Sequence, residues 1–287
     1  MFTVAFLLAA LAANPPSIAS QIPSAIYTDP VHDMVNPARM EVLHIPSGDV
    51  QINGVAYLAA GSGPHPTIII CHGLPGNEKN LDLAQALRRA GWNAITFNYR
   101  GSWGTPGSFR FAQNPEDARA VLAYLRVPEN ARRLGVDTSY LVIAGHSMGG
   151  WVSAMVSSND DSIRGTILIS SGNLGKRFEI PRAQLVARMA DNMEALVGTT
   201  AEAMAEELNV NAAAFDYTRG AAGLANKPML VLSSDDGLAP QSDALVAAVN
   251  KAGGTQVTAV HVATDHSWSD RRIRLQSEVL NWLAKLK

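Results

Sequence analysis

Gly145-His-Ser-Met-Gly149 follows directly on the apolar run Tyr140-Leu-Val-Ile-Ala144, and these ten residues together decide the fold. A buried strand followed by Gly-x-Ser-x-Gly predicts a sharp strand-to-helix turn, which lifts the serine hydroxyl above the sheet. The glycines two residues before and two residues after Ser147 carry no Cβ atom that would collide in so tight a turn. Because the pentapeptide alone also arises by chance, its meaning depends on which other residues can act with Ser147.

Short apolar runs alternate with amphipathic segments along most of the chain. The runs are nearly all apolar and lack strict alternation, which is typical of strands buried on both faces of a parallel sheet. This order predicts an α/β protein with a doubly wound, mostly parallel sheet, whose ligands bind beyond the carboxyl ends of the strands. The expected strands are 67–71, 93–98, 140–144, 165–170, 228–233 and 255–262, and the expected helices are 81–90, 115–125, 242–252 and 269–286.

An antiparallel hairpin is expected before the first parallel strand. Residues 40–45 and 50–57 are rich in β-forming side chains, and Pro46-Ser-Gly-Asp49 separates them with turn residues. We therefore expect the α/β domain to extend over residues 38–287.

One stretch, between residues 171 and 228, contains no run that resembles a strand. Residues 181–197 place their apolar side chains on one helical face, and Thr199-Thr-Ala-Glu202 has the pattern of a capping box that opens another helix. The sequence predicts a small helical cap at about 174–226, lying over the carboxyl edge of the sheet and hence over Ser147. An ordinary crossover packed on the side of the sheet is the alternative.

The N-terminal segment differs from the rest in carrying no charged side chain before Asp29. Residues 2–13 form a continuous apolar and small-residue run, closed by Asn14-Pro-Pro16. The run is too short to span a bilayer as a helix, which needs about 20 residues, but it matches the hydrophobic region of a secretory signal. We expect a signal peptide over residues 1–20 and export to the periplasm or beyond. No Lys or Arg precedes the run, so a cytoplasmic location is the alternative.

The composition argues against several classes of partner. Of the 287 residues, 47% are apolar and 17% are charged, which fits a soluble protein with a large core and no stable membrane insertion. The net charge of −2, without a basic stripe among aromatics, argues against a nucleic-acid partner. With Cys71 alone the chain has no internal disulfide. Neither a metal-binding histidine spacing nor a phosphate-binding glycine pattern occurs, so we expect no metal and no cofactor.

A serine hydroxyl becomes a strong nucleophile only when a nearby base accepts its proton and a carboxylate holds that base. In this topology the chain order is serine, acid, histidine, each in a loop after a strand. Only His261 and His266 follow Ser147. His261 falls inside an expected strand, whereas His266 lies just past its end, so His266 is the preferred base.

Two neighbouring carboxylates follow the expected strand 228–233 and compete for the role of the acid. Asp236 is preferred to Asp235 because Gly237 can turn the chain immediately after it. Asp265 is a weaker candidate, since adjacent residues in a loop rarely orient each other's rings.

Acyl chemistry also needs donors for the oxygen that becomes negatively charged. The backbone N–H of Met148, directly after Ser147, is expected to be one donor, and the loop after strand 67–71 is expected to supply the other. In that loop Pro75 has no N–H, so the N–H of Leu74 is the best candidate.

Together these residues resemble the α/β-hydrolase superfamily, in particular its serine-aminopeptidase-like, dienelactone-hydrolase-like and prolyl-oligopeptidase-like branch. The resemblance runs from about residue 40 to the C-terminus. It implies Ser147 as nucleophile, Asp236 as acid and His266 as base. The motifs that carry it are His72-Gly-Leu-Pro-Gly76, Asn98-Tyr-Arg-Gly-Ser-Trp-Gly104, residues 145–150, Asp236-Gly-Leu-Ala-Pro240 and Asp265-His266.

The function that this resemblance implies is a serine hydrolase that works through an acyl-enzyme. We expect its substrate to be a small to medium carboxylic ester, because nothing in the sequence marks a site for a peptide's amino terminus. A peptidase or amidase with the same triad is one alternative, and a non-catalytic binding protein on the same fold is another. The fold hosts many hydrolases, so the sequence does not identify the ester.

Other polar residues near these motifs are assigned structural roles. We expect His72 and His146 to be satisfied structural histidines, and Arg100 and Trp103 to pack their glycine-rich loop. Three methionines of the expected cap either line an acyl pocket or fill the core: Met189, Met193 and Met204. Three glutamates there are interpreted as a solvated helix face: Glu202, Glu206 and Glu207.

Overall fold

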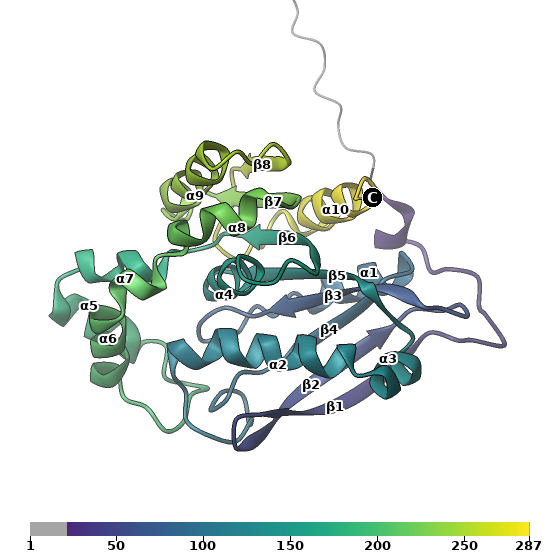
Figure 1. Ribbon diagram of the computed structural model, residues 1–287, viewed down its shortest axis with the longest axis horizontal. Helices are drawn as coiled ribbons and strands as arrows, with labels where there is room; N and C mark the ends of the chain where they lie inside the picture. The colour runs from purple at the N-terminus through teal and green to yellow at the C-terminus, as the bar shows by residue number, and fades with distance from the viewer. Residues whose placement is uncertain (1–21, 287) are drawn as a thin grey trace, which may run out of the picture.

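The computed structural model describes residues 22–286, apart from the side chains of residues 177 and 178. Within these residues, one eight-stranded sheet has the order β1-β2-β4-β3-β5-β6-β7-β8 (Figure 1). The β1–β2 and β2–β4 pairs are antiparallel and all other pairs are parallel, which confirms the expected hairpin and the mostly parallel sheet. The strands are β1 (Arg39–Ser47), β2 (Val50–Leu58), β3 (His65–Cys71), β4 (Asn93–Phe97), β5 (Val136–His146), β6 (Ile163–Ile169), β7 (Met229–Ser234) and β8 (Val257–Val262).

The central strands are buried on both faces. In β3, Ile68 and Ile70 belong to one hydrophobic core, while Ile69 and Cys71 belong to the core on the opposite face. Successive side chains of a strand point to opposite sides, so a continuous apolar run is what two buried faces require. The prediction made from these runs is confirmed for the central strands, but it is wrong for residues 257–262, which form an edge strand with no fully buried residue.

Helices cover each face of the sheet (Figure 1). α1 and α10 pack on one face, and α2, α4 and α9 pack on the other. α2 has Pro115 in its first turn followed by Glu116 and Asp117, residues that suit the positive end of a helix dipole. The helices of these layers are η1 (Ser24–Ile26), α1 (Leu81–Arg89), η2 (Phe111–Gln113), α2 (Asn114–Arg126), α3 (Pro128–Leu134), α4 (Met148–Ser157), α9 (Ala239–Lys251) and α10 (Arg272–Leu283).

The described part of the connection from β6 to β7 contains six helical segments and no strand of the sheet. We call α5, α6 and α7 the helical cap; they lie together beyond the carboxyl ends of the parallel strands and on neither face of the sheet (Figure 1, left). α8 instead packs close to α9, beside the sheet. The segments are η3 (Leu174–Glu179), α5 (Arg182–Ala190), α6 (Ala201–Val210), α7 (Ala212–Phe215), η4 (Tyr217–Gly220) and α8 (Ala221–Ala225).

Main-chain hydrogen bonds fasten the cap to the loop that follows β4. Trp103 N–H donates to Ala195 O over 2.9 Å, and Val197 N–H donates to Gly101 O over 2.9 Å. Phe109 N–H donates in turn to Val197 O at 2.9 Å. The chain between α5 and α6 therefore pairs like a short strand with a loop far away in the sequence.

This pairing explains where the expected helix over 181–197 is wrong. The helix ends at Ala190, and further along the backbone groups of Ala195 and Val197 bond the loop after β4 instead of continuing the helix. Met193, Leu196 and Val197 keep a helical spacing, so their periodicity does not reveal the break. The next helix begins one residue later than the capping box predicts, with Thr200 Oγ1 accepting from Ala203 N–H at 3.1 Å.

The expected signal peptide, residues 1–20, lies outside the described residues. None of the helices within residues 22–286 is long and apolar enough to cross a membrane.

Candidate active site

The chain turns sharply at Ser147, between β5 and α4. Ser147 has φ 57° and ψ −119°, a strained conformation for a residue with a side chain. A Cβ atom on Gly145 would lie 2.0 Å from Gly149 O, and one on Gly149 would lie 2.0 Å from Cys71 O. Both glycines are therefore required by close backbone contacts, and the turn predicted from the pentapeptide is present.

Asp236 and His266 form a hydrogen-bonded pair beyond β7 and β8. His266 Nδ1 lies 2.7 Å from Asp236 Oδ2. The Asp236 side chain is 3% exposed, whereas His266 is 39% exposed and accessible from solvent. The carboxylate accepts a hydrogen bond from Nδ1–H, so in the neutral ring Nε2 is the nitrogen without a proton. The pair thus has the arrangement of a histidine base oriented by a buried acid.

The two rejected candidates, Asp235 and His261, pair with each other instead. His261 Nε2 lies 2.9 Å from Asp235 Oδ1, and its Nδ1 lies 3.0 Å from Ser233 Oγ. Both side chains are more than half exposed, His261 on the edge strand β8 and Asp235 directly after β7. The structure therefore separates a buried-acid pair from a surface pair, and the preferred residues belong to the former.

His146 ties the loop of His266 to the turn at Ser147. Its Nε2 donates to His266 O over 2.7 Å, and the two rings lie 4.6 Å apart. Since His146 directly precedes Ser147, this contact brings the serine and the histidine pair to one place. Among the described residues no hydrogen bond joins Ser147 to His266, and such contacts are often loose in ligand-free enzymes.

The loop after β3 lies against the serine. A Cβ atom on Gly73 would lie 3.0 Å from Ser147 Cβ, so the glycine permits the close approach. Leu74 N–H and Met148 N–H donate to no acceptor within residues 22–286. Two free N–H groups beside a serine are what an oxyanion requires.

Two contacts hold this loop in place. His72 Nδ1 donates to Gly73 O over 2.8 Å, and Trp103 Nε1 donates to Pro75 O over 2.6 Å. Trp103 in turn lies under the Lys79 ammonium, 4.2 Å from the ring centre. His72 and Trp103 therefore support the loop that carries Leu74. The expectation that His72 and His146 are fully satisfied is wrong, because within residues 22–286 the buried Nε2 of His72 and Nδ1 of His146 have no hydrogen-bond partner.

Arg100 is structural as well. Its Nε donates to Asp117 over 2.6 Å, and its Nη2 bonds Glu116 over 2.7 Å. Asp117 is fully buried and also accepts from Ser47 Oγ at 2.6 Å. A charge buried in this way needs its partners, so Arg100 is committed to the protein rather than to a ligand.

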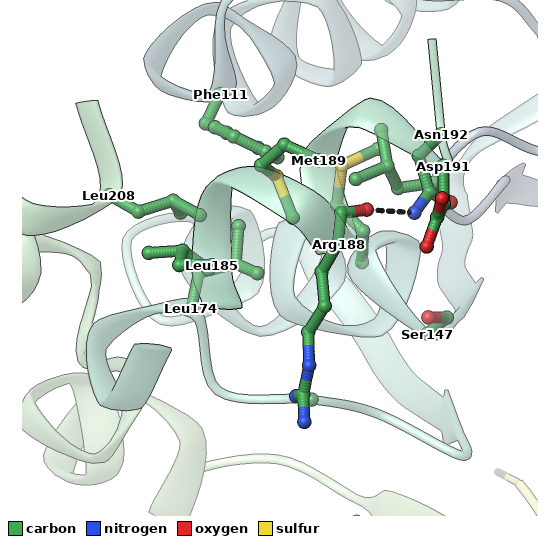
Figure 2. Close-up of a pocket in the computed structure, with 12 residues that line it drawn as sticks. Phe111, Ser147, Leu174, Leu185, Arg188, Met189, Asp191, Asn192 and Leu208 are labelled. Carbon is green, nitrogen blue, oxygen red and sulfur yellow. Dashed lines mark hydrogen bonds between the residues drawn. The ribbon is translucent and has the colours of Figure 1, made fainter. Parts of the chain in front are cut away.

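Ser147, Leu74 and Met148 open into one cavity of about 230 Å³ that reaches the helical cap (Figure 2). Figure 2 shows the side chains of Leu174, Leu185 and Leu208 together on the far side from Ser147. Arg188 at the end of α5 and Asp191 and Asn192 just after it also line the cavity, and no sequence motif predicts these polar residues. The remaining lining residues are Phe111, Gly172 and Met189.

The methionines of the cap divide between the acyl pocket and the core, and one of its glutamates does not lie on a solvated helix face. Met189 lines the cavity, whereas Met204 is fully buried in the core. Glu207 is not on a solvated face, because its carboxylate accepts from Phe111 N–H at 3.0 Å and Ala112 N–H at 2.8 Å. Glu206 is exposed and makes only a long 3.8 Å contact with Arg182.

Burial and hydrogen bonds set the charges of this region. Burial acts to raise the pKa of Asp236, but hydrogen bonds from His266, Leu238 N–H and Ser234 outweigh it and hold the pKa below 3.8. Burial lowers the pKa of His72 and of His146 to about 4. At neutral pH Asp236 is therefore ionised and the two buried histidines are neutral.

Solved structures with this fold include esterases and a peptidase. An esterase of Rhizomucor miehei superposes with a TM-score of 0.66 at 19% identity, over 88% of this chain and 84% of the esterase. The carboxylesterase EstE1, from a metagenomic library, gives 0.62 at 19%, over 93% and 94%. The acylaminoacyl peptidase of Pyrococcus horikoshii gives 0.67 at 15%, over 87% of this chain and 42% of the peptidase. At these identities the likeness shows the fold.

Two curated relatives come from Mycobacterium tuberculosis, the uncharacterized proteins MT2364 and Rv2307c. Each is 27% identical over 125 residues, which is 43% of this chain and 43% of the relative. The match therefore spans less than half the length of either relative. A family model described as the alpha/beta hydrolase family matches residues 68–277, which contain Ser147, Asp236 and His266. The chain belongs to the alpha/beta hydrolase family.

Proposed function

We propose that the protein is a serine esterase, which hydrolyses small to medium carboxylic esters through an acyl-enzyme. The observation that carries this proposal is the convergence, at one turn, of Ser147, two free backbone N–H groups and a cavity whose far side is lined by leucines. Family membership supports a hydrolase, and esterases are among the proteins with this fold.

In the proposed mechanism His266 Nε2 accepts the proton of Ser147 Oγ as the oxygen attacks the ester carbonyl. Asp236 holds the ring in the required tautomer and stabilises the positive charge that forms on it. Leu74 N–H and Met148 N–H bind the oxyanion, and His266 then returns the proton to the leaving alcohol. Water activated by the same ring releases the acid and restores Ser147.

The lining of the cavity supports an ester with an aliphatic acyl chain as the substrate. Its far side is lined by leucine side chains from η3, α5 and α6, which favour an aliphatic chain. A panel of p-nitrophenyl esters of increasing chain length tests this. We expect kcat/KM to rise with the first few methylene groups and then to fall when the chain exceeds the cavity. Equal kcat/KM for all chain lengths would show that the acyl chain does not bind in the cavity.

Asp191 favours one rival function, an aminoacyl amidase or peptidase with the same triad. Its carboxylate lines the cavity and is able to bind the amino group of an aminoacyl substrate. Aminoacyl p-nitroanilides beside the esters decide between the two. If they exceed the esters in kcat/KM and Asp191→Asn abolishes that advantage, the amidase replaces the esterase.

We also propose that residues 1–20 are a signal peptide and that the mature protein is exported. The proposal rests on the uncharged apolar run of residues 2–13. The small-residue sequences Ala10-Leu-Ala12 and Ser17-Ile-Ala19 are possible cleavage sites. Expression of the full chain followed by N-terminal sequencing tests the proposal: a mature protein that starts after Ala12 or Ala19 supports export, and an intact N-terminus contradicts it.

A further inference from the structure

Trp103 lies between the helical cap and the loop that carries Leu74, and it bonds both. Its backbone N–H donates to Ala195 O over 2.9 Å, in the chain that follows α5. Its indole Nε1–H donates to Pro75 O over 2.6 Å, in the loop after β3. Pro75 directly follows Leu74, which lines the same cavity as Ser147. A single residue therefore connects the cap to the proposed oxyanion site.

The indole and the backbone of Trp103 are held on several sides. The Lys79 ammonium lies 4.2 Å from the ring centre and donates to Asn98 Oδ1 over 2.9 Å. Asn98 Nδ2 also lies 3.4 Å from Trp103 O. Trp103 has a φ of 49°, which a residue with a side chain adopts only where its surroundings impose it. Because the ring and the backbone are both restrained, a displacement of the backbone of Trp103 also displaces its indole.

The chain that bonds the backbone of Trp103 also forms part of the cavity wall. Asp191 and Asn192 line the cavity just after α5 (Figure 2). Successive hydrogen bonds continue from there toward Ala195: Asn192 N–H donates to Met189 O over 3.0 Å, and Leu196 N–H donates to Met193 O over 3.0 Å. A ligand in the cavity therefore contacts a bonded segment that ends at the acceptor of the Trp103 N–H.

We propose that Trp103 is a positioning residue, which transmits the contact between an acyl chain and the helical cap to the backbone N–H of Leu74. This inference rests on the proposed esterase mechanism. An acyl chain that fills the cavity holds residues 191–197 in place, and through Trp103 and Pro75 it also fixes the N–H that binds the oxyanion. Binding energy from the unreactive part of the substrate is then used in the transition state and raises kcat.

Trp103→Phe tests this role, because it keeps an aromatic ring beside Lys79 and removes the N–H that bonds Pro75. The measurements are kcat and KM for p-nitrophenyl acetate and p-nitrophenyl butyrate. In wild type we expect kcat for the butyrate to exceed kcat for the acetate by about fivefold. In Trp103→Phe this ratio should fall to about one, with a change in KM for the butyrate of less than about twofold. An unchanged ratio in Trp103→Phe, or equal kcat for both esters in wild type, would overturn the proposal.

Trp92→Phe is the matched control. Trp92 is half-buried like Trp103 but directly precedes β4, whereas Trp103 lies in the loop that follows this strand. Its ring packs against Tyr140, with ring centres 5.6 Å apart. The control should keep the wild-type ratio of kcat values, and a fall as large as in Trp103→Phe would overturn the proposal. Trp103→Leu replaces Trp103→Phe if that variant does not fold.

The amide resonance of Leu74 in NMR spectra separates failure of this inference from failure of the proposed function. Met193→Ala disturbs the cap two residues before Ala195, at a side chain that is not part of the cavity lining. We expect this change to shift the Leu74 resonance in the wild-type background and to leave it in place in the Trp103→Phe background. The measurement needs no hydrolysis of an ester.

The two kinds of failure then give different results. A wild type that hydrolyses no ester, but in which Met193→Ala shifts the Leu74 resonance only when the indole is present, would end the esterase proposal and keep the role of Trp103. An active wild type in which Met193→Ala shifts the resonance equally with and without the indole would overturn the role of Trp103 and keep the esterase.

Discussion

Ser147 shows how single residues shape this site. Its positive φ is imposed by a turn in which the backbone of β5, the turn itself and the end of β3 are in contact. Gly149 is required because a Cβ atom there would lie 2.0 Å from Cys71 O, and not because of its dihedral angles. Backbone atoms cannot move aside as a flexible side chain can.

Gly149→Ala should therefore destabilise the protein strongly. We expect the free energy of unfolding to fall by about 3 kcal/mol or more, as in severe overpacking. Gly91→Ala is the contrasting change, because that position has open space but a φ of 87°, and it should cost about 1 kcal/mol. Urea denaturation measures both. Equal losses would show that space at Gly149 does not limit the turn.

The neighbouring acids Asp235 and Asp236 provide a second comparison at this scale. Asp236→Asn should lower kcat by about 10⁴-fold, which is the typical loss in a serine protease when the catalytic histidine is held in the wrong tautomer. Asp235→Asn should leave kcat unchanged, because Asp235 bonds His261 on the surface. Steady-state ester hydrolysis measures both. A loss for Asp235→Asn as large as for Asp236→Asn would reverse the assignment of the acid.

At the scale of elements, the cap is fixed by residues whose roles its own sequence does not reveal. Glu207 in α6 accepts from two backbone N–H groups of η2, which starts at Phe111, a residue of the cavity wall. The chain after α5 adds main-chain bonds to the loop after β4. The cavity wall therefore depends on contacts between elements about a hundred residues apart.

Removing the carboxylate of Glu207 should loosen this wall. Glu207→Ala leaves the half-buried Phe111 N–H without its acceptor, at a cost of about 1 kcal/mol, and we expect KM for the preferred ester to rise about fivefold. Glu206→Ala is the matched control, one position away and exposed. Kinetics on the ester panel give the result. If both variants raise KM equally, Glu207 does not hold the cavity.

The sequence predicts the elements of the sheet well and those of the cap poorly. β3 and β5 carry continuous apolar runs because two faces are buried, a signal that depends on local sequence alone. The end of α5 depends on pairing with a distant loop, and α3, with seven residues, is too short for a clear periodicity. His266 and Asp236 are found because chain order and loop position restrict the choice. Arg188, Asp191 and Asn192 belong to no motif, and only the fold shows that they line the cavity.

For the molecule as a whole, buried neutral histidines determine the response to acid. In the unfolded chain His72 and His146 take up protons as the pH falls through about 6.5, while in the folded protein they stay neutral until about pH 4. Below pH 6.5 the unfolded state binds more protons at these two positions, so they cost stability as the pH falls from 6.5 to 4, and their contribution is constant below pH 4.

Each histidine should account for about 3 kcal/mol of this loss, since the shift is about two and a half pKa units. His72→Asn and His146→Gln keep an amide donor in place of the bonded ring nitrogen and remove the titration. Urea unfolding at several pH values should show a flatter dependence in each variant than in wild type. Parallel curves for wild type and variants would show that these histidines do not control acid stability.

The proposed mechanism depends above all on Ser147 being a nucleophile activated by His266. Labelling the folded protein with a fluorophosphonate probe and locating the adduct by mass spectrometry tests this most directly. We predict one adduct, on Ser147, and a labelling rate that falls about a thousandfold or more in His266→Ala. No adduct on Ser147, or undiminished labelling in His266→Ala, would contradict it.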